Sequence, residues 1–242
     1  MTIESSQLIV AGIPVEVVRK DIKNLHLGVY PPHGRVRVAA PLVITDDAVR
    51  LAVIDKLGWI KKQRHQFQNQ PRQSKREMVN GESHYYLGQR YRLKVLEHNA
   101  PPKITLRGVA TLELRVRPGM TADQREAILQ RWYRDQLRAM LPPLLDAWQN
   151  NLGVELTGWG IRKMKTKWGS CNTNARRAWF NLELAKKSPL CIEYIVAHEL
   201  IHLRVRHHDA QFTALLDRHL PTWRQARDLL NHEPLGHEEW CE

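Results

Sequence analysis

The chain of 242 residues is long enough for one large domain or two small ones, each with its own hydrophobic core. A formal net charge of +12 favours anionic partners such as nucleic acid, acidic proteins or anionic lipid, although an ordinary basic surface gives the same charge. No apolar run of about eighteen residues occurs, so the composition excludes a transmembrane helix and we expect no membrane partner.

The cysteine content and the first residues indicate the compartment. Cys171, Cys191 and Cys241 form no evident disulfide framework, and an odd, sparse count fits a reducing environment. The N-terminal residues lack the basic start and long apolar stretch of a signal peptide. We therefore expect a cytoplasmic protein. The sequence carries no signal for an oligomeric state.

The first section of the chain alternates between apolar and polar residues, which predicts β-strands between residues 7 and 40. The apolar positions are Leu8, Val10, Val15, Val17, Leu25, Leu27, Val29, Val36 and Val38. A turn is expected at Pro31-Pro32-His33-Gly34. One helix near 46–66 should follow, capped at Thr45 or Asp46. The polar stretch 68–75 is expected to be a loop or linker.

A second β section precedes a long helix. Alternation at Tyr91, Leu93 and Val95, and again at Leu112, Leu114 and Val116, predicts two strands. Thr121-Ala122-Asp123-Gln124 has the pattern of a capping box that opens a helix. Pro142-Pro143 is expected to break or restart that helix, because proline lacks the backbone N–H that a helix interior needs.

The last third of the chain alternates strands and helices. Strands are expected around Ile161 and over 179–184, and a helix is expected to begin near Pro189. One or two helices should close the chain between about 209 and 231, interrupted at Pro221. These elements predict an α+β fold with a β-rich N-terminal domain over 1–118 and a second domain over 119–242.

The most specific pattern is His198-Glu199-Leu200-Ile201-His202. Histidines four apart on a helix share one face, so both imidazoles can bind one Zn²⁺ ion. Glu199 then lies beside the metal and can take a proton from a bound water. The flanking apolar residues predict a buried helix, where unpaired polar groups cost several kcal/mol. The alternative is a core helix whose histidines bond to nearby backbone carbonyls.

His208, six residues after His202, is the favoured third ligand. The spacing is that of HExxHxxGxxH proteases, but Val205 replaces their glycine and no methionine turn follows. His207, Glu233 and Glu238 are the alternative third ligands. Three protein ligands leave a fourth position for a water, as in catalytic zinc sites. Candidate hydrogen-bond donors to the oxyanion are Tyr194, His207, His219 and His232.

Two sequence blocks resemble the YgjP-like metallopeptidase family, which is related to the SprT-like zinc proteases. They are Lys167-Trp168-Gly169-Ser170-Cys171, and Tyr194 to Leu203 with His208. Further similar landmarks are Trp59-Ile60, Gly88-Gln89-Arg90-Tyr91, Trp132-Tyr133 and Met164-Lys165-Thr166-Lys167, so the resemblance covers most of residues 10–235. It implies a small zincin-like catalytic domain with an HExxH helix, zinc on His198, His202 and His208, and Glu199 as general base.

The resemblance has one local departure. The family usually reads Asn-His-Ser around the third ligand, where this chain reads His207-His208-Asp209. Asp209 is expected to cap the helix that follows, with a hydrogen bond to a ligand imidazole as the alternative role.

Three further features of the sequence allow two interpretations each. In the block around Trp168, the tryptophan fills the core, or Ser170, Cys171 and Asn172 line the cleft beside the metal. The strand over 179–184 is either an edge that pairs with an extended substrate or an ordinary internal strand. A basic cluster either lines the cleft or covers an ordinary solvated surface. The cluster consists of Arg162, Lys163, Lys165, Lys167, Arg176, Arg177, Lys186 and Lys187, with Glu183 as its only acid.

Together these patterns predict a zinc-dependent metallohydrolase, foremost a metallopeptidase that cleaves polypeptides. One alternative is a nucleotide phosphoanhydride hydrolase, although the sequence contains no Gly-rich phosphate loop. The other is a zinc-stabilised nucleic-acid-binding module without catalysis, which would need a closed zinc site with four protein ligands.

Overall fold

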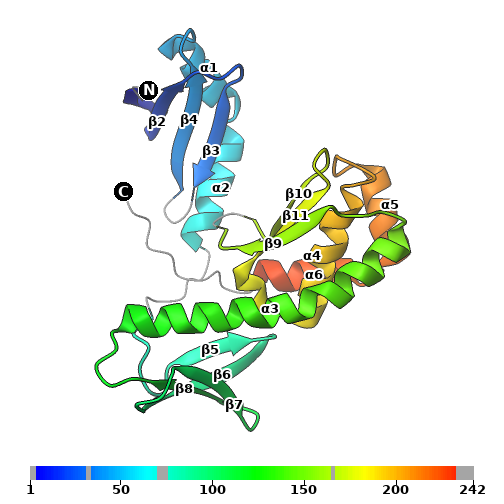
Figure 1. Ribbon diagram of the computed structural model, residues 1–242. Helices are drawn as coiled ribbons and strands as arrows, with labels where there is room; N and C mark the ends of the chain where they lie inside the picture. Colours follow the sequence, from blue (N-terminus) through cyan, green and yellow to red (C-terminus); the bar gives the residue numbers. More distant parts are fainter. Residues whose placement is uncertain (1–3, 31–33, 70–75, 165–166, 233–242) are drawn as a thin grey trace. The chain divides into compact units, whose positions relative to one another are not determined.

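The computed structural model describes residues 4–30, 34–69, 76–164 and 167–232 (Figure 1). The chain divides into two units, Met1–Pro71 with Glu239–Glu242, and Arg72–Glu238. Each unit has a separate hydrophobic core, so each is described by itself. The predicted turn residues Pro31 to His33 and most of the predicted linker lie outside the described residues. The elements form the α+β fold that the sequence predicts.

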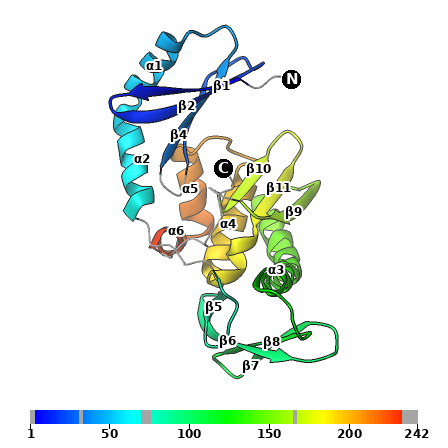
Figure 2. The ribbon, with the colours of Figure 1, turned by 90° about the vertical axis from the view of Figure 1, so that its left-hand side faces the viewer.

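The smaller unit is a four-stranded sheet with two helices (Figure 2). Its strands are β1 (Glu4–Val10), β2 (Ile13–Lys20), β3 (His26–Tyr30) and β4 (Arg35–Pro41), in the order β1-β2-β4-β3. The predicted alternation is confirmed, since Val15, Val17, Val36 and Val38 are fully buried in its core. The predicted helix is present as two, α1 (Asp46–Asp55) and α2 (Leu57–Asn69). The Thr45 hydroxyl caps α1 by accepting from the Ala48 N–H.

The larger unit begins with a second four-stranded sheet. Its strands are β5 (Ser83–Tyr86), β6 (Gln89–Glu97), β7 (Lys103–Arg107) and β8 (Thr111–Val116), in the order β5-β6-β8-β7. Leu93, Leu112 and Leu114 enter one core with the helices of the C-terminal half. Packing therefore places this sheet with the C-terminal elements, whereas the sequence analysis assigned it to a domain ending at residue 118.

A long helix, α3 (Ala122–Leu152), follows the second sheet. The predicted capping box is present, with Thr121 and Gln124 bonding to each other's backbone N–H. The expected break at Pro142-Pro143 is wrong, because α3 continues through both prolines (Figure 1). Leu137, Leu141 and Leu145 form one buried stripe across the prolines, and burial of that stripe offsets the missing backbone hydrogen bonds.

The remaining elements surround the HExxH segment. The strands β9 (Gly158–Arg162), β10 (Gly169–Asn172) and β11 (Arg177–Asn181) form a sheet in the order β10-β11-β9. A 3-10 helix, η1 (Leu182–Lys186), precedes α4 (Pro189–Ile201), α5 (Ala210–His219) and α6 (Trp223–His232). The strand expected over 179–184 ends at Asn181, whose side chain accepts from the Glu183 N–H and so caps η1.

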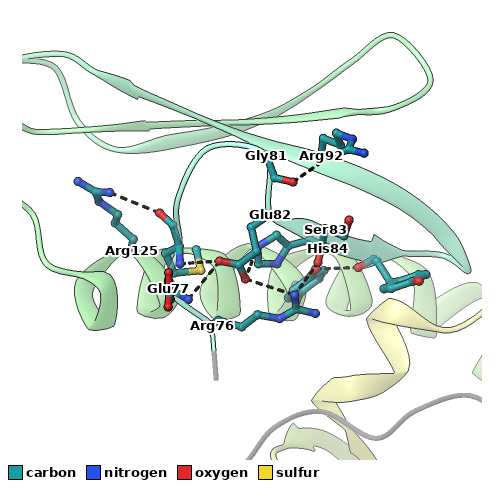
Figure 3. A network of polar contacts seen from close by, with 11 residues as sticks. Arg76, Glu77, Gly81, Glu82, Ser83, His84, Arg92 and Arg125 are labelled. Atoms are coloured by element: carbon teal, nitrogen blue, oxygen red, sulfur yellow. Dashed lines mark hydrogen bonds and ion pairs between the residues drawn. The ribbon is translucent and has the colours of Figure 1, made fainter. Parts of the chain in front are cut away.

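A polar network holds the first residues of the larger unit against its sheet (Figure 3). The Glu82 carboxylate accepts from the backbone N–H groups of Glu77 (3.1 Å) and Met78 (2.7 Å) and from the Arg76 guanidinium (3.3 Å). His84 is 3% exposed, and its Nε2 lies 3.3 Å from Glu82 Oε1. Burial, with Arg76 and Lys186 nearby, lowers the pKa of His84 to about 3, so its ring is neutral at pH 7.

No helix among the described residues is both long enough and apolar enough to cross a bilayer.

Candidate metal centre

Helix α4 positions the first half of the HExxH motif. Ser188 caps its N-terminus by accepting from the Cys191 N–H, and Pro189 occupies the first turn, as the sequence predicts. Its apolar residues are buried on nearly every side, which fixes the helix in the core. His198 and Glu199 therefore lie in its last turn, and His202 is its C-terminal cap.

The three predicted ligands come together. One ligand nitrogen from each of His198, His202 and His208 lies within 4.8 Å of the others. The Nε2 atoms of His198 and His208 are 2.9 Å apart. Phe212 packs against all three rings, at centroid distances of 4.9, 4.9 and 4.7 Å. This side chain covers one side of the cluster and restricts how the rings can rotate.

The protonation states of the cluster suit a metal ion. Burial and the neighbouring imidazoles lower the pKa of His198 to about 3, and burial also lowers the pKa of His202. Both rings are therefore neutral at pH 7, which is the form that binds metal. His202 Nδ1 lies 3.2 Å from the Val205 carbonyl, so it carries the proton and leaves Nε2 free to coordinate. The residues present thus fit Zn²⁺ held by three imidazoles.

The turn after His202 forms without the glycine of the HExxHxxGxxH pattern. Val205 N–H donates to the Ile201 carbonyl (2.9 Å), and the Val205 side chain is buried. Asp209 caps α5 by accepting from the Phe212 N–H (3.0 Å), which confirms its expected capping role. His207 does not belong to the cluster, and Glu233 and Glu238 lie outside the described residues. Within the described ranges no fourth His, Cys, Asp or Glu joins the three histidines.

Glu199 lies beside the triad and is 5% exposed. Burial raises the pKa of this carboxyl to about 8, and Lys167 acts in the opposite direction. Gly169 of β10 approaches it closely, since a Cβ built on Gly169 would lie 2.5 Å from Glu199 Oε1. Only glycine leaves room for the carboxylate at this place. Sequence analysis missed this role, although Gly169 belongs to the block that carries the family resemblance.

A cleft of about 750 Å³ opens over the histidines and Glu199. Residues 167–174 form one part of its lining, and the rest comes from α4, from His202, Arg206 and His208, and from α6. Trp168, Ser170 and Cys171 all line it, which favours the cleft interpretation of this block. Burial, together with Glu199, raises the pKa of the Cys171 thiol to about 11, so Cys171 stays protonated at pH 7.

Asn181 is a buried residue that positions this lining. Its side-chain amide donates to the carbonyls of Met164 (2.9 Å) and Lys167 (2.8 Å), and its oxygen accepts from the Met164 N–H (3.3 Å). These bonds tie both ends of the segment before β10 to the end of β11. Lys167 is thereby held near Glu199. The sequence offered no signal for this role beyond a polar residue in an apolar strand.

The strand over 179–184 and the basic cluster lie only partly at the cleft. β11 pairs with both β9 and β10, which favours the interpretation of this segment as an internal strand, and the edge strand beside the cleft is β10. Of the described members of the basic cluster, only Lys167 lines the cleft. Arg162 and Arg177 lie over the Trp179 ring, at 5.1 and 4.8 Å.

One oxyanion candidate lies in the cleft. Tyr194 lines it, contacts the His198 ring edge-on at 5.7 Å between centroids, and stacks on Trp223 at 6.2 Å. His207 and His219 do not line the cleft, and His219 Nδ1 instead lies 3.0 Å from the Asn151 side chain. The side chain of His232 lies outside the described ones.

An α+β fold with a histidine triad at the end of an HExxH helix is typical of metallopeptidases. The chain belongs to the YgjP-like family, since the model of the YgjP-like metallopeptidase domain matches residues 23–233. Among solved structures, it is similar to the metallopeptidase zymogen of Pyrococcus abyssi abylysin. That likeness has a TM-score of 0.34 and 19% identity, over 36% of this chain and 89% of the other. Comparison with curated proteins gives no match.

Proposed function

We propose that this protein is a zinc-dependent metallopeptidase in which His198, His202 and His208 hold Zn²⁺ and Glu199 is the general base. One observation carries the proposal: ligand nitrogens of three imidazoles converge within 4.8 Å of one another beside the buried carboxyl group of Glu199, in an open cleft. Zinc is favoured because imidazole nitrogen is a preferred ligand of this ion and three of them suit its tetrahedral geometry.

The chain's own residues account for most of the chemistry. Bound zinc supplies a Lewis acid for the scissile carbonyl and acidifies a water molecule. The charge of a bound zinc ion would favour the ionised form of Glu199 despite its burial. Glu199 would then take a proton from the attacking water and pass it to the leaving amine. Tyr194 lies one helix turn before His198 and lines the cleft, so its hydroxyl is the proposed donor to the oxyanion. The open edge of β10 offers backbone groups to an extended polypeptide.

A cytoplasmic location is part of the proposal. The sparse and odd number of cysteines in the sequence is typical of proteins from a reducing compartment.

Glu199→Ala tests the mechanism. The variant keeps its fold and zinc, because Glu199 is not a proposed ligand, and it loses peptide hydrolysis by at least about a hundredfold. Zinc content, circular dichroism and cleavage of a peptide library are measured together. Full activity in the variant would contradict the role of Glu199.

The same samples separate the two alternatives. A nucleotide hydrolase would cleave nucleoside triphosphates and no peptide, and this activity would disappear in Glu199→Ala. A nucleic-acid-binding module would show salt-dependent DNA binding that survives the substitution. The proposal expects Glu199-dependent cleavage of peptides alone.

A further inference from the structure

The charged side chains that line the cleft are nearly all cationic. Lys167, Arg206 and Arg227 come from three separate segments, namely the residues before β10, the turn between α4 and α5, and helix α6. Among the described residues that line the cleft, the only acidic side chain is that of Glu199, which is almost completely buried. A cleft lined by one sign of charge attracts substrates of the opposite sign.

Arg227 lies against an aromatic ring beside the triad. Its guanidinium lies over the Trp223 ring at 5.0 Å, and Trp223 stacks on Tyr194, which contacts His198. The contact of Arg227 with Asp228, at 3.4 Å, joins side chains that are 47% and 58% exposed. Exposed pairs of this kind contribute little, so a substrate carboxylate can compete for the guanidinium.

Arg206 is coupled to the metal site through the backbone. It lies two residues before His208 and directly after Val205, whose carbonyl orients His202. Two residues span at most about 7 Å between Cα atoms, so Arg206 is close to any bond that is cleaved at the triad. Its side chain is exposed and pairs with no acidic group among the described residues.

We propose that the cleft selects polypeptides with Asp or Glu side chains close to the scissile bond, and that Arg206 and Arg227 bind these carboxylates. This inference rests on the proposed peptidase function and names its substrate class. A planar guanidinium binds a carboxylate through two parallel hydrogen bonds, which gives both arginines geometric as well as charge selectivity. Lys167, close to Glu199, adds to the same field.

The test compares matched peptides with the full-length, zinc-loaded protein. Peptides that the protein cleaves are taken from an unbiased library, and each acidic residue near the cleaved bond is replaced by its amide. Wild type is expected to cleave the acidic peptide with a kcat/KM about tenfold above that of the amide peptide. In Arg206→Gln and Arg227→Gln this ratio should fall by about fivefold, chiefly through KM. Arg138→Gln is the control, because Arg138 is exposed on α3 and lies outside the cleft.

Each outcome decides between this inference and the function on which it rests. The inference is supported if wild type prefers the acidic peptide over the amide peptide, and if this ratio of kcat/KM values falls in both cleft variants but not in Arg138→Gln. The ratio should also decline with added salt. Equal cleavage of acidic and amide peptides overturns the inference, and Glu199-dependent cleavage would still support the peptidase. An acidic preference that both arginine variants retain overturns the assignment to Arg206 and Arg227. Hydrolysis of nucleotides without any peptide cleavage overturns the peptidase function itself.

Discussion

Gly169 positions the proposed general base because it has no side chain. The Glu199 carboxyl group occupies the space that a Cβ on this residue would need. Contacts this short force either the strand or the carboxylate to move, and the burial of both leaves little freedom. Gly169 is therefore part of the geometry of the proposed catalytic site.

Gly169→Ala is expected to lower kcat/KM for peptides by about tenfold or more, because a displacement of the base by about 1 Å is costly. Zinc content should stay at the wild-type level, since no proposed ligand moves. Gly158→Ala in the same sheet is the control, because its nearest neighbour would be Arg177 Nε at 3.9 Å. Wild-type activity in Gly169→Ala would contradict this account of Glu199.

The role of a single residue can be predicted from the sequence where its side chain contacts residues that are close to it along the chain. The caps at Thr45, Thr121 and Asp209 are confirmed, because a capping bond depends on residues three positions apart. The role of Gly169 depends on Glu199, which is 30 positions away, and that of Asn181 depends on Met164, which is 17 positions away. Both roles therefore follow only from the packing of the fold. The spacing of the HExxH motif brings His198 and His202 together, whereas His208 depends on the turn at Val205.

At the scale of elements, a regular apolar pattern predicts the presence of a helix or strand better than it predicts the residues where that element begins and ends. The four strands of the first sheet follow the predicted alternation, as do β6 and β8 of the second, whereas β5 and β7 were not predicted. The predicted break at Pro142-Pro143 is wrong because the buried apolar face of α3 continues before and after both prolines. Packing of that face outweighs the loss of helical hydrogen bonds at proline. The end of β11 at Asn181 is likewise set by a side-chain cap and not by the apolar pattern.

The network around Glu82 makes the larger unit sensitive to acid. The pKa of His84 is lowered from 6.5 to about 3 in the fold, so below pH 6.5 the unfolded chain binds a proton that the native protein does not. The stability from the neutral ring is therefore complete above about pH 6.5 and is lost as pH falls toward 3. His84→Asn removes this titration, so the stability difference between wild type and variant should shrink as the pH falls.

Urea unfolding at a series of pH values between about 7 and 4 measures that difference. His98→Asn, at an exposed position of the same unit, serves as the control. A difference between wild type and His84→Asn that stays constant with pH would contradict the assigned direction of the pKa shift.

At the scale of the whole molecule, the two cores share no residue. Val38 and its neighbours form the core of the smaller unit, while the histidine triad belongs to the larger one. The domain boundary expected at residue 118 followed the change from β to α elements. The structure instead groups β5 to β8 with α3 and α4, because their apolar faces are buried against one another.

Separate cores predict two unfolding transitions in calorimetry of the zinc-loaded chain. Val38→Ala removes buried methyl groups and should lower the stability of the smaller unit by about 2 kcal/mol. It should therefore lower the midpoint of one transition only. A zinc chelator should lower the midpoint of the other, because the metal binds only the folded larger unit. A single transition that responds to both changes would show that the units unfold together.

The zinc content of His208→Ala, purified in parallel with wild type, tests the central claim most directly. We predict one zinc ion per wild-type chain, and zinc binding that is weakened more than about a hundredfold in the variant, since even residues that only support a ligand alter affinity by 10–100-fold. His207→Ala, which changes the exposed neighbour outside the triad, should keep its zinc. Full zinc content in His208→Ala would contradict a site built from these three histidines.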